Sequence, residues 1–229
     1  MSATNRVHHA TILSIVAILI SSFSLYESHM QRISATTDEL SIIASRPMLD
    51  ERICVDPRQF HSPINIVSVP FQIVISNIGA STVSIVDYNI RTSTIENKEI
   101  YYSELNGGFI AADSNERLIL PITIEPGKSF KARLIVGVNF GDKAASILKQ
   151  QFEEKHVVPV SILSNILAQN SIDFFDNEVV PIRSGDRVVG WQMKSFEKEQ
   201  LFYITLKTAR NNEFHGIISW YNKLTASAS

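Results

Sequence analysis

The stretch PFQIVISNIGASTVSIVDYNI, residues 70–90, decides the fold class. Phe71, Ile73 and Ile75 lie two positions apart, so an extended chain would place them on one face. Residues 77–81 form a turn cluster with asparagine, glycine and serine. After the turn the alternation resumes, with one face made of Val83, Ile85, Asp87 and Asn89 and the other of Ser84, Val86, Tyr88 and Ile90. The stretch therefore predicts two half-buried β-strands around a turn.

The same pattern continues toward the C-terminus. Residues 117–124 and 129–140 read as strands joined by a proline-glycine turn at 125–128. Residues 201–222 read as two strands around Arg210-Asn211-Asn212, and Asn106-Gly107 predicts a tight hairpin turn. Strands spaced by turns in this way favour two antiparallel sheets packed face to face, and helices do not alternate with strands as a parallel sheet would require.

One segment departs from the β pattern. Residues 142–169 have helical spacing, with Asp142 as the expected N-cap of a first helix and residues 160–170 as a second helix. We therefore expect a mainly β domain over residues 47–229 that carries a small helical insertion at about 142–169.

The N-terminal region has a different character. After a short tail (residues 1–9), residues 10–26 contain no charged residue, and 17 helical residues would span about 26 Å. This length is near the lower limit for crossing a bilayer, so we expect a retained transmembrane anchor. The alternatives are a cleaved signal peptide, for which Ser22-Phe23-Ser24 is a poor cleavage site, and a buried core helix. The anchor predicts a single-pass protein of the cell (inner) membrane whose domain lies outside the cytoplasm.

Residues 27–46 are expected to form a helical stalk. Apolar or small residues recur there in steps of four and three, which is the spacing of a short coiled coil. Met30, Ile33 and Leu40 are the candidates for self-association into a homo-oligomer. The alternatives are a helix that lies against its own domain and a simple spacer. Pro47 ends the predicted helix.

The overall layout resembles a known family. An N-terminal anchor is followed by PFQIVISNIGASTVSIVDYNI, IEPGKSFKARLIVGV and a final LFYITLKTARNNEFHGIISWY. This layout is similar to that of bacterial single-pass membrane proteins with an immunoglobulin-like β-sandwich domain, many of them uncharacterised. The resemblance implies that fold, but it carries over no functional residue.

Motifs for chemistry are missing from the sequence. The net charge of −2 gives no reason to expect nucleic acid as a partner, and one cysteine, Cys54, cannot form an intramolecular disulfide. We find no nucleophile elbow, phosphate-binding loop or histidine-cysteine metal pattern, so we expect no catalytic, metal or cofactor residues. Asp173, Asp176 and Glu178 lie close together, but without a calcium-loop glycine they read as a polar turn.

Exposed aromatic residues are the remaining candidates for partner contacts. Tyr101 and Tyr102 lie side by side, and Tyr221 is expected to face outward because Trp220 shares the alternation of the core.

Three functions remain open at this stage. The first is a membrane-anchored binding or scaffold module that mediates protein–protein contacts in the cell envelope. The second is a domain that binds carbohydrate or an envelope polymer, which requires an exposed aromatic platform. The third is an enzyme whose active-site residues meet only in space.

Overall fold

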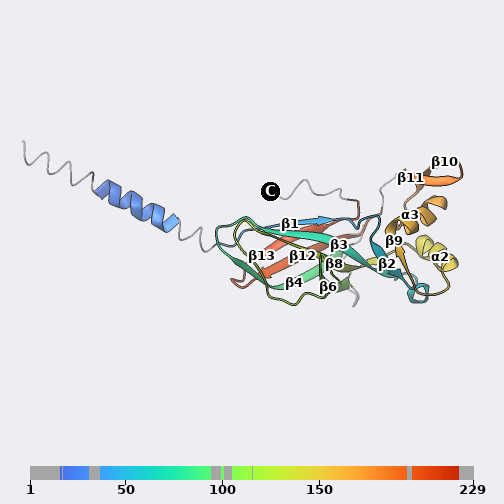
Figure 1. Cartoon of the computed structure of the whole chain (residues 1–229), viewed down its shortest axis with the longest axis horizontal. Helices are drawn as coiled ribbons and strands as arrows, with labels where there is room; N and C mark the ends of the chain where they lie inside the picture. Colours follow the sequence, from blue (N-terminus) through green and yellow to red (C-terminus); the bar gives the residue numbers. More distant parts are fainter. Residues whose placement is uncertain are drawn as a thin grey trace, which may run out of the picture.

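The architecture is a pair of antiparallel β-sheets with a helical insertion at one end (Figure 1). The computed structural model describes residues 16, 18–30, 37–93, 99–100, 105–114, 116–194 and 198–221. The first sheet has the order β1 (Leu40–Ser45), β3 (Ile66–Asn77), β8 (Ser129–Asn139) and β6 (Asn106–Ala111). The second has the order β13 (Glu213–Ile218), β12 (Leu201–Thr208), β4 (Val83–Ser93) and β5 (Glu99–Ile100), and β7 (Ile122–Ile124) also pairs with β4. The predicted mainly β fold with antiparallel sheets is confirmed.

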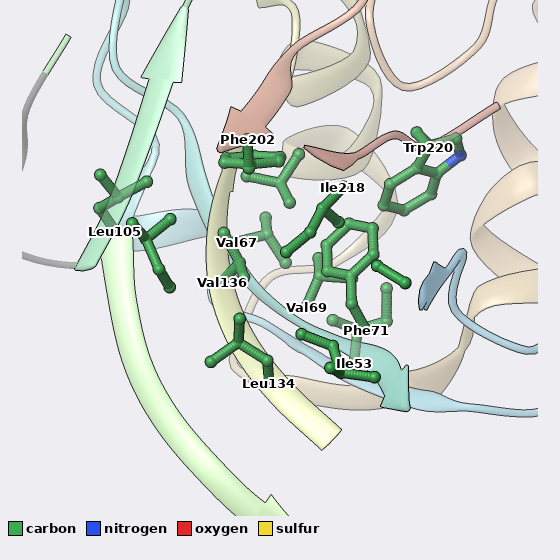
Figure 2. Close-up of a cluster of buried hydrophobic side chains, with 14 of the residues drawn as sticks. Ile53, Val67, Val69, Phe71, Leu105, Leu134, Val136, Phe202, Ile218 and Trp220 are labelled. Carbon is green, nitrogen blue, oxygen red and sulfur yellow. The ribbon is translucent and has the colours of Figure 1, made fainter. Parts of the chain in front are cut away.

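The core lies between the two sheets. Phe71 of β3 and Phe202 of β12 are fully buried, and their ring centroids are 6.0 Å apart although the two strands belong to different sheets. Trp220 packs edge-on against Phe71, also at 6.0 Å, which confirms its predicted place in the core. Figure 2 shows these three rings gathered with Ile218 in one buried cluster. In β3 the alternation thus reports the face that the strand turns toward the other sheet. In β4 the predicted division of faces is wrong, because the register shifts after Ile85 and the buried side passes from Val83 and Ile85 to Ile90.

Asn77 joins the two sheets at the predicted turn. Its side-chain amide donates to the backbone carbonyl oxygens of Ser81 (2.7 Å) and Ile124 (2.9 Å). Its own backbone carbonyl oxygen accepts a hydrogen bond from the N–H group of Gly127 (2.9 Å). The chain passes from β3 to β4, and from β7 to β8, at this point, so each connection crosses between sheets. One buried asparagine therefore satisfies polar backbone groups in both crossings.

The helical insertion lies where residues 142–169 predicted it. It contains α2 (Asp142–Gln151), β9 (His156–Pro159) and α3 (Val160–Gln169). Around it lie β2 (Arg52–Val55), which pairs with β9, the short 3-10 helix η1 (Pro57–Gln59), and the hairpin of β10 (Val179–Ser184) and β11 (Arg187–Met193). Figure 1 shows these elements together at one end of the sheets.

The N-cap of α2 differs from the expectation. Gly141 is the N-cap, and Asp142 is the first helical residue. The carboxylate of Asp176, which is distant in sequence, accepts hydrogen bonds from the backbone N–H groups of Lys143 (3.0 Å) and Ala144 (2.8 Å). A Cβ on residue 141 would lie 2.2 Å from Asp176 Cγ, so only glycine leaves room for this remote cap.

The predicted hairpin turn at Asn106-Gly107 is wrong. These residues begin β6, in which Asn106 pairs with Val136 of β8 and Gly107 lies at a register shift before Gly108. A Cβ on Gly107 would lie 2.5 Å from the Ile135 side chain, so this glycine permits close packing between strands instead of a reversal of the chain.

The predicted helical stalk is also wrong over its last part. Helix covers residues 18–30, but residues 40–45 form β1, which pairs with β3 from Leu40↔Asn77 to Ser45↔Gln72. The edge of β3 offers this segment backbone hydrogen-bonding partners. These partners are distant in sequence, so the local helical spacing could not predict them. Leu40 therefore packs against the domain core and does not face a partner helix.

The anchor prediction concerns residues 10–26. In the portion of the chain that the structure describes, no helix is both long and apolar enough to cross a bilayer. The helical residues from 18 to 30, with Val16, are exposed along their whole length.

Candidate functional site

Five polar residues form a cluster where the chain enters the first sheet; we call it the entry cluster. The Asp38 side chain is 1% exposed, and it accepts hydrogen bonds from Thr208 Oγ1 (2.5 Å) and Asn212 Nδ2 (3.1 Å). Arg210 forms an ion pair with the same carboxylate and donates to Ser81 Oγ at 3.0 Å. The cluster thus fastens the segment before β1 to the β12–β13 turn and to the β3–β4 turn.

The electrostatics of the entry cluster favour an ionised aspartate. Burial opposes the charge on Asp38, but the hydrogen bonds from Thr208, Asn212 and Arg210, together with the positive charge of Arg210, lower the pKa of the carboxyl below its ordinary value. All of these groups hold the carboxylate in place, and none of them is arranged to move a proton. We read the cluster as a structural fastening.

A second buried carboxylate, that of Asp173, lies in the segment between α3 and β10. Asp173 accepts from the N–H groups of Phe175 (2.9 Å) and Asn177 (2.8 Å) and from Asn177 Nδ2 (2.9 Å). The Tyr221 hydroxyl also donates to it. Burial first, and then the charge of Asp173, raise the pKa of Tyr221 far above its ordinary value. The prediction that Tyr221 faces outward is therefore wrong, because its hydroxyl is bound to an internal acceptor.

The acidic residues near this carboxylate have separate roles. Asp173 satisfies its own turn, Asp176 caps α2, and the exposed Glu178 pairs with Lys194 at 2.8 Å. Among the residues that the structure places, no group of three or more histidine, cysteine, aspartate or glutamate side chains could hold a metal ion.

The remaining predicted contact residues are not brought together. Tyr101, Tyr102 and Ile33 lie outside the described residues. Met30 lies on the N-terminal helix and is 48% exposed.

The best candidate for a binding surface is the outer face of the second sheet; we call it the outer face. The strand registers align its side chains in three rows across β4, β12 and β13. Arg91, Tyr203 and Ile217 form the first row, in which the tyrosine is 37% and the isoleucine 39% exposed. The other rows are Asn89, Thr205 and His215, then Asp87, Lys207 and Glu213.

The three rows differ in chemistry. In the third row, Lys207 lies between two carboxylates, which is a favourable cross-strand arrangement of charge. In the second row, Thr205 Oγ1 and His215 Nδ1 share a hydrogen bond of 3.0 Å. The first row combines an aromatic ring, an aliphatic side chain and a guanidinium group, and tyrosine and arginine are enriched at the energetic centres of protein interfaces.

The sequence contained part of this signal. The alternation of residues 201–218 assigns Tyr203 and Ile217 to the face opposite the core, but it cannot show that they are neighbours. Their adjacency depends on the register Tyr203↔Ile217, and the position of Arg91 depends on its pairing with Tyr203.

A shallow cavity lies on the other side of the molecule. It has a volume of about 420 Å³ and is lined by Met48, Asp50, Glu51, Arg52, Arg133 and Val157. Arg133 is already bound there to Glu51 at 3.1 Å and to the carbonyl oxygens of Ala111 and Ser114. This arginine holds two loops against the first sheet, so we do not regard the cavity as a reaction site.

The fold and these sites define a class: a two-sheet antiparallel β protein with a helical insertion, two buried carboxylate fastenings and an exposed sheet face. No family model matches the chain, and no curated protein or solved structure matches it significantly.

Proposed function

We propose that this protein is a membrane-attached binding module that uses the outer face of its second sheet to contact another protein. The observation that carries the proposal is the first row, where Tyr203 and Ile217 are exposed side by side next to Arg91. An exposed aromatic and aliphatic pair flanked by polar rows has the composition of a small interface centre with a polar rim. The immunoglobulin-like relationship and the bacterial source stay predictions.

The attachment to a membrane is supported by the N-terminal helix. Eight of its large apolar side chains are between 45% and 75% exposed: Val16, Ile18, Leu19, Ile20, Phe23, Leu25, Tyr26 and Met30. Burying each such side chain yields about 1.5 to 3 kcal/mol, so transfer of this helix out of water gains on the order of 10 kcal/mol. A lipid bilayer offers that environment to the uncharged residues 10–26, with the β domain held at its surface.

Photo-cross-linking in native membranes tests the protein contact. A photoreactive phenylalanine analogue replaces Tyr203 in one variant and Ile43 in a matched control. Ile43 is 53% exposed on the outside of the first sheet, so it is a fair probe of non-specific collision. We expect a discrete protein adduct from position 203 and none from position 43.

Two results would argue against the proposal. Equal adducts from both positions would show that the outer face has no special role. Adducts that a polysaccharide-degrading enzyme removes would favour the carbohydrate-binding alternative, for which Tyr203 with Asn89 and Thr205 would supply the ring and the polar contacts.

Alkaline extraction of the same membranes tests the attachment. The wild-type chain should stay in the pellet, whereas the double variant Leu19→Lys, Ile20→Lys should be released, because charges in a bilayer core are strongly disfavoured. Release of both chains would exclude an integral anchor and leave the outer-face proposal to be judged by cross-linking alone.

A further inference from the structure

The Asn106-Gly107 pair lies at the β6 edge of the first sheet, where β6 faces the second sheet. Asn106 is exposed, and its side-chain oxygen Oδ1 accepts a hydrogen bond from the hydroxyl group of Tyr88 on β4 at 2.9 Å. The backbone N–H group of Gly108 donates to the same oxygen at 3.0 Å. Among the described residues, both hydrogen bonds of the Asn106 side chain therefore go to Oδ1.

The Tyr88 hydroxyl is held in place as a donor. The ring of Tyr88 packs edge-on against Phe109 of β6, with the ring centroids 4.6 Å apart. Burial raises the pKa of Tyr88 above its ordinary value, although the hydrogen bond to Asn106 and the charge of Arg117 act in the opposite direction. The hydroxyl is therefore protonated at neutral pH and is available to donate to Asn106.

Arg117 strengthens the second donor. Its guanidinium group donates to the backbone carbonyl oxygen of Gly107 at 2.7 Å, and a Cβ on Gly108 would lie 3.0 Å from Arg117 Nε. The Gly107 carbonyl belongs to the same peptide group as the Gly108 N–H. Hydrogen bonds in such a chain polarise one another, so Arg117 makes the Gly108 N–H a stronger donor to Asn106.

An asparagine followed by glycine can react with its own backbone. The backbone nitrogen of Gly107 attacks Asn106 Cγ; the new N–Cγ bond forms, the Cγ–Nδ2 bond breaks, and Nδ2 leaves as ammonia with the proton from Gly107. Water then opens the cyclic imide to give aspartate or isoaspartate. The tetrahedral intermediate carries negative charge on Oδ1, and donors aimed at that oxygen stabilise it. Gly107 has no side chain to hinder the attack, and it lies at the register shift, where the backbone ladder is interrupted.

We propose that Asn106 is a site of self-catalysed deamidation, in which Tyr88 and the Gly108 N–H stabilise the charge on Oδ1 and then bind the carboxylate that forms. The product fits this site because both donors can also donate to a carboxylate, and the nearby positive charge of Arg117 favours an anion. The only other reactant is water, which reaches the exposed Asn106. The reaction uses no residue of the outer face, so it is independent of the proposed partner contact.

A comparison of deamidation rates in the folded and the urea-unfolded chain tests the proposal. The full-length protein is incubated in detergent at neutral pH, and conversion at residue 106 is measured by mass spectrometry of its peptides. We expect the folded chain to react about tenfold faster, well below the factor of 100 or more that a buried oxyanion donor contributes in an enzyme. A folded chain that reacts no faster than the unfolded chain would overturn the proposal.

Asn170 is an internal control in the same digests. It is also followed by a small residue, Ser171, but its Nδ2 donates to the carbonyl oxygen of Ile166 at 2.9 Å. We expect no acceleration at Asn170 in the folded chain. Equal acceleration at Asn106 and Asn170 would show a general effect of the solution conditions and would refute a role for the two donors.

Variants of the donors test how the reaction is promoted. Tyr88→Phe keeps the ring against Phe109 and should slow the folded chain by about two- to tenfold, the factor that one hydrogen bond contributes, without changing the rate in urea. Arg117→Met should also slow the folded chain, whereas Arg117→Lys should restore much of the rate because lysine can still donate to Gly107. An unchanged rate in Tyr88→Phe would refute the role of the hydroxyl. If near-ultraviolet circular dichroism shows that Tyr88→Phe is unfolded, the test rests on the Arg117 pair, and equal rates in those two variants would refute the proposal.

The variant Asn106→Asp, which is one product of the reaction, tests the fit of the carboxylate. It should melt at or above the temperature of the freshly purified wild type. Arg117→Met should lower the melting temperature more in the Asn106→Asp chain than in the wild type, because only the former has a carboxylate near the guanidinium. A lower melting temperature for Asn106→Asp than for the wild type would show that the donors do not accommodate the product.

Discussion

Replacement of Tyr221 by phenylalanine removes one hydroxyl from the buried carboxylate of Asp173. A hydrogen bond to a charged, buried acceptor contributes about 1.5 to 3 kcal/mol to stability. In the variant Asp173 keeps its hydrogen bonds from Phe175 and Asn177, so the carboxylate is still partly satisfied. The loss in the free energy of unfolding should therefore lie near the lower end of that range, at about 2 kcal/mol. For a domain of this size that corresponds to a fall in the melting temperature of about 4 to 8 °C.

Urea denaturation followed by tryptophan fluorescence measures this change, because Trp220 packs against Phe174 and Phe175 of the same corner. Tyr203→Phe is the matched control: it removes the same hydroxyl from an exposed side chain, and the expected change is within about 0.5 kcal/mol. If Tyr221→Phe unfolds at the wild-type urea concentration, the hydrogen bond to Asp173 is absent in solution and the assignment of Tyr221 to the interior is refuted.

The same hydroxyl predicts a response to alkaline pH. The folded-state pKa of Tyr221 is raised above the unfolded value of about 10, so its contribution is fully present below pH 10 and is lost as the pH rises further. The stability of the wild-type chain should therefore fall more steeply above pH 10 than that of Tyr221→Phe. Parallel curves for the two chains would show that this tyrosine ionises as freely in the folded state as in the unfolded one.

Three other changes have defined outcomes. Phe71→Ala should lower the free energy of unfolding by about 3 to 5 kcal/mol in urea titrations, because it empties the centre of the core. Gly141→Ala should cost about 1 to 3 kcal/mol in the same assay, since the new Cβ displaces the carboxylate that caps α2. The folded-state pKa of Asp38 is lowered, so its contribution is present above pH 3.8 and is lost at lower pH; the stability gap between the wild type and Asp38→Asn should therefore narrow as the pH falls below that value.

The parts of the fold that the sequence predicted are those where one strand face is buried. Phe71, Ile73 and Ile75 alternate because every second side chain enters the core, and the same logic placed Trp220 correctly. The helices of the insertion were also recognisable, since their buried residues recur at helical spacing. The spacing of apolar residues along the chain indicates which side chains are buried, and in these segments that burial determines the secondary structure.

The errors arise where a distant segment supplies the deciding interaction. Residues 40–45 have helical spacing with the preceding region, yet the edge of β3 makes them a strand. Asn106-Gly107 has the composition of a tight turn, yet Ile135 on β8 requires a small residue there for packing. Tyr221 alternates with Trp220 as an outward residue would, yet Asp173 captures its hydroxyl. None of these partners lies near the residue in sequence.

The two buried carboxylates explain how this domain fixes the segments before its first strand and after its last strand without a disulfide. Asp38 fastens the segment before the first strand, and Asp173 holds Tyr221 just after the last strand. Asp38 accepts its donors from a distant segment, whereas Asp173 accepts the distant Tyr221 hydroxyl in addition to donors from its own turn. The cost of burying the charge of Asp38 is therefore offset only when the distant segments are correctly placed.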